Sequence, residues 1–204
     1  MPHLPHTTMK IDFHTHRLDA TPGTAVVSLP ADALLHPDRW LDADGRLPHA
    51  AEGAMYSAGI HPWWTSLPEF DAPRWLSVLQ RLAALPEVRH IGECGIDTLR
   101  GAGVEVQQRL FVEQAALAEA LQKPLTIHCV RAFDRLLALH KELSPAQRWT
   151  IHGFRGRPEL ARQLLRAGFD LSFGPRRNEQ SWALTPPDRR HEETDDDPSA
   201  RVTP

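Results

Sequence analysis

The feature that most constrains the fold of this chain is a regular alternation of short apolar segments with amphipathic helical segments. The apolar segments are rich in β-branched or aromatic residues and are bounded by Gly, Pro or polar residues, which is typical of β-strands. They lie at 9–13, 24–29, 54–60, 88–93, 124–129, 149–153 and 169–174. Helical periodicity predicts helices at 74–85, 104–121, 132–143 and 158–167. Strands separated by single helices predict a parallel sheet built from right-handed β/α units.

This pattern favours a closed barrel over an open sheet. An eighth strand is expected near 189–195, and a (β/α)₈ barrel rarely has fewer than about 200 residues. We therefore predict a minimal TIM-type barrel, one domain over residues 1–204, with a leader at 1–8 and a polar, irregular tail at 185–204. The last strand and helix are expected to be shortened or irregular, because unpaired charges are unfavourable in a buried strand. Residues 30–52 are expected to be loop-like, with one poorly defined helix.

Composition excludes several classes of protein. With 41% hydrophobic and 24% charged residues, the chain can form a core and is not a disordered protein. The net charge of −3 means that nucleic-acid binding would require a local basic patch. No apolar run is long enough to span a membrane, and the first residues lack the features of a secretory signal. Cys94 and Cys129 form no disulfide framework, so a reducing, cytoplasmic location is expected.

Metal-capable side chains gather at the carboxyl ends of the predicted strands, in a chain that contains twelve histidines. These ends meet at one rim of a parallel barrel, where active sites lie. The residues concerned are Asp12, His14, His16, His61, Glu93, His128, His152 and Asp195. The sequence therefore predicts a metal centre at this rim.

His14 and His16 carry the most direct metal-binding pattern. Residues two apart on a strand point to the same side, so the two imidazoles can bind one ion. Imidazole suits Zn, Mn, Fe, Co or Ni, and a carboxylate such as Glu93 can bridge two ions. Taken alone, the pair could be a chance occurrence in a polar turn, and His128 or His152 could each be a core histidine. Their joint occurrence with Glu93 favours the metal centre.

Six sequence blocks occur in the order, and with roughly the spacing, of a known family. The blocks are IDFHTH, GIHPWW, IGECGID, KPLTIHC, WTIHGFRG and ETD. On these blocks the chain resembles the TatD family of metal-dependent deoxyribonucleases, of the amidohydrolase superfamily, from Met9 to about Asp195. The resemblance implies a TIM-barrel phosphodiesterase that uses one to three divalent ions (Zn, Mg, Mn, Fe, Co or Ni). Its implied substrate is DNA, single-stranded or at 3′ ends.

The resemblance also implies roles for the strand-end residues. The implied ligands are His14, His16, Glu93 and Asp195 for one ion, and Glu93, His128 and His152 for a second. His61 is implied to lie beside the site and to touch substrate phosphate or the attacking water. Asp195 is implied to orient that water and to accept its proton. Asp195 also belongs to the acidic run EETDDDP, so a solvated tail is the alternative for this residue.

Other residues near the blocks could bind substrate. Arg131, Arg155 and Arg157 could form a rim that binds phosphate, since guanidinium groups pair well with phosphate oxygens. Ordinary surface arginines are the alternative. Trp63 and Trp64 could stack on a base, or simply pack at the barrel mouth.

Two further functions remain open at this stage. The first is an amidohydrolase-type enzyme that cleaves a small amide or lactone. A carbamylated lysine would favour that activity, but the matching position carries Glu93, which favours the nuclease. The second is a catalytically impaired barrel that acts as a binding protein, suggested by the charged C-terminal segment.

Overall fold

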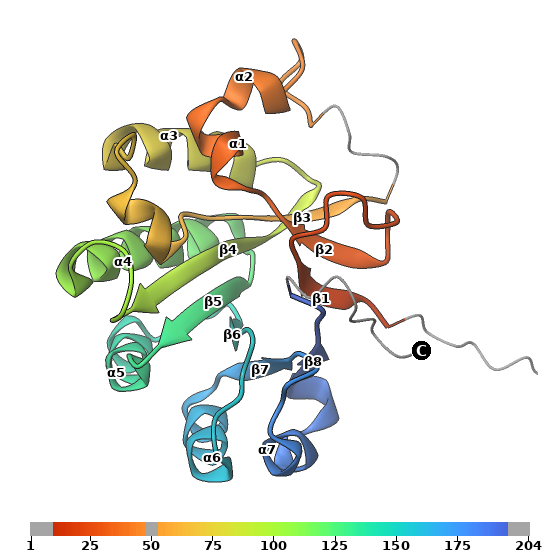
Figure 1. Cartoon of the computed structure of the whole chain (residues 1–204), viewed down its shortest axis with the longest axis vertical. Coiled ribbons are helices and arrows are strands. Elements are labelled where there is room, and N and C mark those ends of the chain that lie inside the picture. Colours follow the sequence, from red (N-terminus) through yellow and green to blue (C-terminus); the bar gives the residue numbers. More distant parts are fainter. Residues whose placement is uncertain (1–9, 48–52, 196–204) are drawn as a thin grey trace, which may run out of the picture.

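Eight parallel strands form the sheet of this protein in strict chain order, which confirms the predicted barrel (Figure 1). The computed structural model describes residues 10–47 and 53–195. The strands are β1 (Asp12–Thr15), β2 (Ala25–Ser28), β3 (Met55–Ala58), β4 (Val88–Asp97), β5 (Leu125–Val130), β6 (Trp149–Ile151), β7 (Asp170–Phe173) and β8 (Arg190–Glu192). The predicted leader and the part of the tail beyond Asp195 lie outside the described residues.

The chain after β8 closes the barrel against β1. Thr15 and Asp195 form a parallel bridge, in which Asp195 N donates to His14 O at 3.0 Å. One residue earlier, the hydroxyl of Thr194 donates to Asp12 Oδ2 at 2.5 Å, and its backbone N–H donates to Asp12 Oδ1 at 3.0 Å. These contacts fix the position of Asp195 beside the end of β1.

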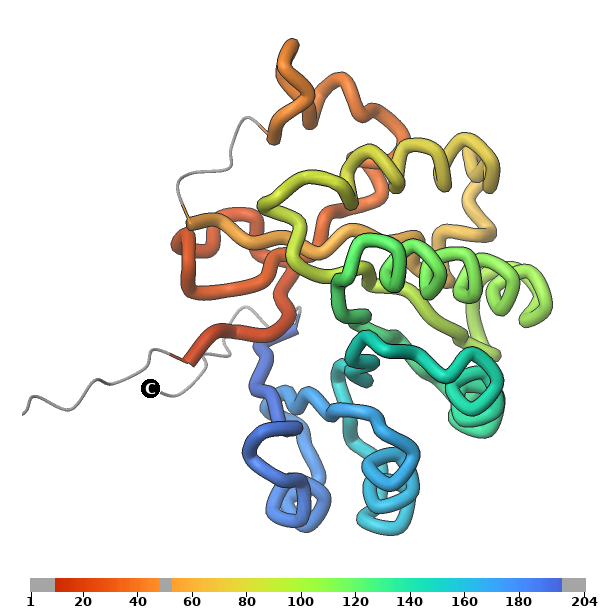
Figure 2. Tube along the Cα trace, turned by 180° about the vertical axis from the view of Figure 1, so that it is seen from behind, coloured from red at the N-terminus to blue at the C-terminus, as the bar shows by residue number. Residues whose placement is uncertain are grey.

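Helices follow most strands and cover the outside of the sheet, as the view from behind shows (Figure 2). They are α1 (Ala31–Leu35), α2 (Pro37–Trp40), α3 (Ala72–Ala83), α4 (Val104–Leu121), α5 (Phe133–Leu143), α6 (Pro158–Ala167) and α7 (Glu179–Leu184), with 3₁₀ helices η1 (Pro62–Ser66) and η2 (Pro187–Arg189). The four predicted helices are confirmed. The segment expected to be loop-like contains α1 and α2 in its described part. None of the helices in the described residues has the length and apolarity needed to cross a membrane.

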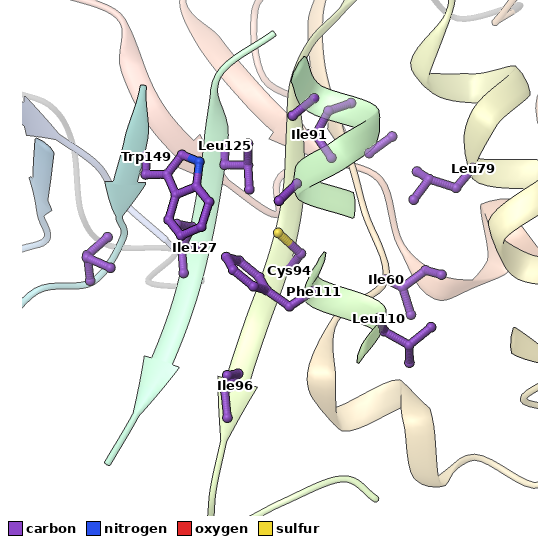
Figure 3. Close-up of a cluster of buried hydrophobic side chains, with 14 of the residues drawn as sticks. Ile60, Leu79, Ile91, Cys94, Ile96, Leu110, Phe111, Leu125, Ile127 and Trp149 are labelled. Atoms are coloured by element: carbon purple, nitrogen blue, oxygen red, sulfur yellow. The ribbon is translucent and has the colours of Figure 1, made fainter. Parts of the chain in front are cut away.

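The apolar core lies between the sheet and the helices. Phe111 of α4 packs edge-to-face on Trp149 of β6, with ring centroids 5.0 Å apart, and Cys94 of β4 lies beside them (Figure 3). Both cysteines are free thiols, and Cys94 is a buried core residue.

The last strand is short, as predicted, with three residues, and it pairs in parallel with β7. Each of its charged or polar side chains has a partner. Arg190 lies over the Trp182 ring at 4.3 Å, and Glu192 accepts from Lys10 Nζ at 2.7 Å. His191 Nε2 lies 3.4 Å from Asp170 Oδ2. These contacts offset the loss of hydration that would otherwise oppose a strand of this composition.

Candidate metal centre

Glu93 lies at the centre of the predicted site. Strand β4 continues to Asp97, so Glu93 lies within the strand and not at its end as the sequence suggested. Its carboxylate is 4% exposed. Oε1 lies 2.6 Å from His152 Nε2, 2.9 Å from His128 Nδ1 and 3.1 Å from His61 Nε2. One oxygen atom therefore faces three imidazoles from three different strand ends.

The second oxygen of Glu93 faces the histidines of β1. Oε2 lies 3.3 Å from His14 Nε2 and 3.5 Å from His16 Nε2. Asp195 Oδ1 lies 4.0 Å and 3.7 Å from the same two nitrogen atoms. Both predicted ligand sets therefore come together at the Glu93 carboxylate, one at each of its oxygens.

Buried ring nitrogens that form no well-aligned hydrogen bond indicate that this centre can bind metal cations. His14 Nδ1 is buried without a hydrogen-bond partner among the described residues, and its buried Nε2 lies 3.3 Å from Glu93 Oε2 without forming a well-aligned hydrogen bond. This arrangement is unfavourable unless another ligand satisfies the two nitrogens. Sets of side chains offer ligand atoms within 4.8 Å of one another: His14, Glu93 and His152; His14, His16 and Asp195; His61, Glu93 and His128. Imidazole and carboxylate donors in this arrangement fit divalent transition metals.

Glu93 and His152 form a buried ion pair. Burial alone would raise the pKa of Glu93, but the facing imidazoles of His152, His128 and His14 hold it well below its usual range. Burial alone would lower the pKa of His152, but the carboxylates of Glu93 and Glu193 raise it well above its usual range. At neutral pH the pair is therefore a carboxylate and an imidazolium.

His61 has a defined tautomer. Its Nδ1 accepts a hydrogen bond from Trp63 N at 3.1 Å. Burial lowers the pKa of His61, so the ring is neutral and carries its single proton on Nε2. That N–H points at Glu93 Oε1. His61 is thus arranged as a hydrogen-bond donor.

Asp97 is a site residue that the sequence interpretation missed. Its Oδ2 lies 3.2 Å from His128 Nε2, the nitrogen that faces away from Glu93. It also accepts from Trp63 Nε1 at 2.6 Å, and its side chain is 2% exposed. A carboxylate on the outer nitrogen fixes the tautomer and orientation of a ligand histidine. The signal was present, since the apolar pattern of IGECGID runs past Glu93 to this residue.

Glu193 places a carboxylate beside the outer nitrogen of His152, as Asp97 does for His128, and the sequence interpretation missed it too. Its Oε1 accepts from Gly153 N at 2.5 Å and lies 3.5 Å from His152 Nδ1. The residue is 4% exposed, although it belongs to the acidic run EETDDDP. A run of charged residues is usually exposed to solvent, so the burial of Glu193 could not be predicted from the composition of this segment.

Comparison with known proteins identifies the family. The family model described as TatD related DNase matches residues 11–200. The chain belongs to this family. It is 36% identical over 127 residues to the 3′-5′ ssDNA/RNA exonuclease TatD of Cronobacter turicensis, covering 59% of this chain and 46% of that protein. It is 35% identical over 136 residues to the protein of the same name in Pantoea vagans, covering 63% and 49%. The chain thus spans about half the length of these curated relatives.

Solved structures of the TatD family show the same fold. The TatD homologue YJJV of Escherichia coli K12 superposes with a TM-score of 0.67 at 23% identity, covering 89% of this chain and 77% of that one. A TatD family hydrolase of Entamoeba histolytica gives a TM-score of 0.65 at 18% identity, covering 92% and 73%. These matches support the TIM-type barrel.

The remaining predicted residues of this TatD-family chain lie outside the centre. Asp12 does not face it, because its carboxylate is bonded to Thr194. A cavity of about 310 Å³ opens over the centre, lined by Pro30, Ala31, Trp63 and Trp64 together with His61 and all the candidate ligands except His14. Arg131, Arg155 and Arg157 are exposed, and within the described part of the chain none of them lines this cavity. Arg155 lines a smaller cavity beside Glu193 and Asp195.

Proposed function

We propose that this TatD-family chain is a metal-dependent nuclease that hydrolyses phosphodiester bonds of DNA, at the 3′ ends of single strands. The observation that carries the proposal is the Glu93 carboxylate, which faces His14 and His16 with one oxygen and His61, His128 and His152 with the other. The names of the curated relatives, which are 3′-5′ ssDNA/RNA exonucleases, support the polarity and the substrate.

We assign the ligands as two sets that share Glu93. The sets are His14, His16, Glu93 and Asp195 for one ion, and Glu93, His128 and His152 for a second, within a total of one to three divalent ions. When bound, such ions lower the pKa of water and neutralise negative charge on phosphate. Asp97 and Glu193 act from outside, each holding one ligand histidine in orientation.

The chain's own groups supply the proton transfers and the positioning. Asp195, 23% exposed at the edge of the centre, orients the attacking water and accepts its proton. His61 offers its Nε2–H, which faces Glu93 Oε1 in this structure, as a hydrogen-bond donor to a phosphate oxygen, because Trp63 N fixes its tautomer. Arg155, which lines a cavity together with Asp195, contacts substrate phosphate, and the exposed Arg131 and Arg157 contribute to the same phosphate-binding rim.

The decisive experiment measures cleavage of 3′-labelled single-stranded DNA in the presence of Mn²⁺. We expect cleavage that EDTA abolishes, and a loss of more than about 100-fold in Glu93→Gln, since changes in the outer shell alone reduce activity by about 10- to 100-fold. Glu113→Gln, on the exposed side of α4, is the matched control and should keep full activity.

Two results would replace the proposal. Stoichiometric metal binding without turnover of any phosphodiester would indicate a binding protein. Activity toward amides or lactones alone would indicate an amidohydrolase. The single domain over residues 1–204 and the cytoplasmic location stay predictions.

A further inference from the structure

The surface next to the metal centre carries an arginine stacked on a tryptophan. The guanidinium of Arg100 lies over the Trp63 ring, with its Cζ 4.3 Å from the ring centroid. Trp63 lines the cavity over the centre and is 39% exposed. Arg100 is exposed, so the guanidinium plane has one side on the indole and the other open to solvent. Among the described residues, no carboxylate forms an ion pair with Arg100.

The indole is held rigidly by the centre itself. Its Nε1 donates to Asp97 Oδ2 at 2.6 Å, the same oxygen that faces His128 Nε2. The ring also packs edge-to-face on His61, with centroids 4.8 Å apart. Trp63 is therefore fixed in orientation relative to two residues of the centre.

Hydrogen bonds also hold the backbone of the loop that carries Arg100. Asp97 Oδ1 accepts from Arg100 N at 3.2 Å, and the buried Gln107 donates through Nε2 to Arg100 O at 2.8 Å. Ala102 N donates to Thr65 Oγ1 at 2.8 Å, which ties the loop to η1, the helix that carries Trp63. An exposed loop with its backbone bonded to buried side chains loses little conformational entropy when it binds a ligand.

A flat cation on an aromatic ring is a surface that nucleobases recognise. Unpaired bases stack on guanidinium planes and aromatic side chains, and this stacking tolerates any sequence because every base has a π-face. The positive charge of Arg100 also suits the phosphates on either side of a stacked base. A base inside a duplex has both faces covered and could not bind in this way.

We infer that the Arg100–Trp63 stack is the nucleobase-binding subsite of this protein, on which an unpaired base adjacent to the scissile phosphate stacks against the outer face of the guanidinium. This inference rests on the proposed nuclease function and specifies how the same site selects single strands. The subsite lies against His61 and His128. Since the proposed function is cleavage at 3′ ends, the base concerned belongs to a nucleotide near the 3′ end of the strand.

The test separates base stacking from charge. Fluorescence anisotropy with Mn²⁺ measures binding of a labelled oligothymidylate with non-hydrolysable 3′-terminal linkages. A series of otherwise identical strands carries a single abasic site at successive positions. For the wild type, one abasic position near the 3′ end should weaken binding by about 5- to 150-fold, the range of one base–aromatic stack.

Arg100→Ala and Arg100→Lys should both weaken binding of the intact strand by a similar factor and remove the sensitivity to that abasic position. Lysine keeps the positive charge but lacks the planar guanidinium on which a base can stack. Arg81→Ala, an exposed arginine on α3, is the matched control and should keep the full sensitivity.

Three results would overturn the inference. In the first, Arg100→Ala weakens the intact and abasic strands by the same factor. In the second, Arg100→Lys keeps the wild-type affinity for the intact strand and the wild-type sensitivity to the abasic site, which would make Arg100 a phosphate contact only. In the third, the wild type does not bind the intact strand. Because binding is measured without cleavage, a wild type that binds as expected but cleaves no strand would count against the nuclease function and not against the subsite.

Discussion

Binding of a divalent ion should expel a proton from His152. Its Nε2 lies 2.6 Å from Glu93 Oε1 and its Nδ1 lies 3.5 Å from Glu193 Oε1. These two carboxylates raise the pKa of His152 well above its usual range, so the metal-free protein holds an imidazolium there at neutral pH. A histidine must lose its proton on one nitrogen to bind a metal. Because the metal-free protein carries one more proton than the metal-bound protein, raising the pH favours binding.

The expected size of this effect follows from one released proton. The affinity for Mn²⁺ should rise about tenfold per pH unit, or about 1.4 kcal/mol, from neutral pH up to the raised pKa of His152. Burial lowers the pKa values of His16 and His61, so these rings are already neutral and release nothing. Glu93 is already ionised, because its pKa lies well below its usual range.

Isothermal titration calorimetry in buffers of different ionisation enthalpy counts the released protons directly. We expect about one proton per binding event in the wild type and none in His152→Asn. His16→Asn is the matched control. It should bind Mn²⁺ more weakly but still release the proton, since the imidazolium belongs to His152. A wild-type affinity that stays constant with pH, with an enthalpy independent of the buffer, would refute this reasoning.

Three further predictions concern residues around the centre. Glu193→Gln should keep the hydrogen bond from Gly153 N but remove the carboxylate that orients His152, so the Mn²⁺ affinity, compared at a pH where His152 is neutral in both proteins, should fall about 10- to 100-fold; an unchanged affinity would remove Glu193 from the site. Asp170→Asn should destabilise the protein in urea unfolding by about 2 kcal/mol at pH 7, because burial alone would raise the pKa of Asp170 from 3.8, yet hydrogen bonds from one histidine and two arginines lower it to about 2. That stabilisation is fully present above about pH 4 and is lost as the pH falls through about 2, so a gap between variant and wild type that widens in acid would contradict it. Gly95→Ala should destabilise the protein by more than about 3 kcal/mol in the same assay, since Gly95 has φ +145° and a Cβ there would lie 1.9 Å from His128 O; wild-type stability would show that β4 adapts.

The parts of the site that the sequence predicted depend on local spacing. His14 and His16 share a side of β1 because they are two residues apart, and Glu93 was found because it follows an apolar strand-like segment. The ends of the predicted strands placed His128, His152 and Asp195 at the same rim, and the family blocks implied only their roles as ligands. These inferences needed only the direction of the strands.

The parts that the sequence did not predict depend on partners far away in the chain. Glu193 lies in an acidic run, and its burial against Gly153 and His152 arises only when β8 closes the barrel. Likewise, the charges of β8 are tolerated because Lys10 and Trp182 lie beside them. Composition describes the residues themselves and cannot supply such contacts.

The claim that Glu93 joins two sets of metal ligands is tested most directly by anomalous diffraction from crystals of the Mn²⁺-loaded protein, collected on both sides of the manganese absorption edge. We expect two anomalous peaks at the Glu93 carboxylate, one bonded to His14, His16 and Asp195, the other to His128 and His152. Crystals with no peak at this carboxylate, in which the histidines contact Glu93 only through hydrogen bonds, would contradict it.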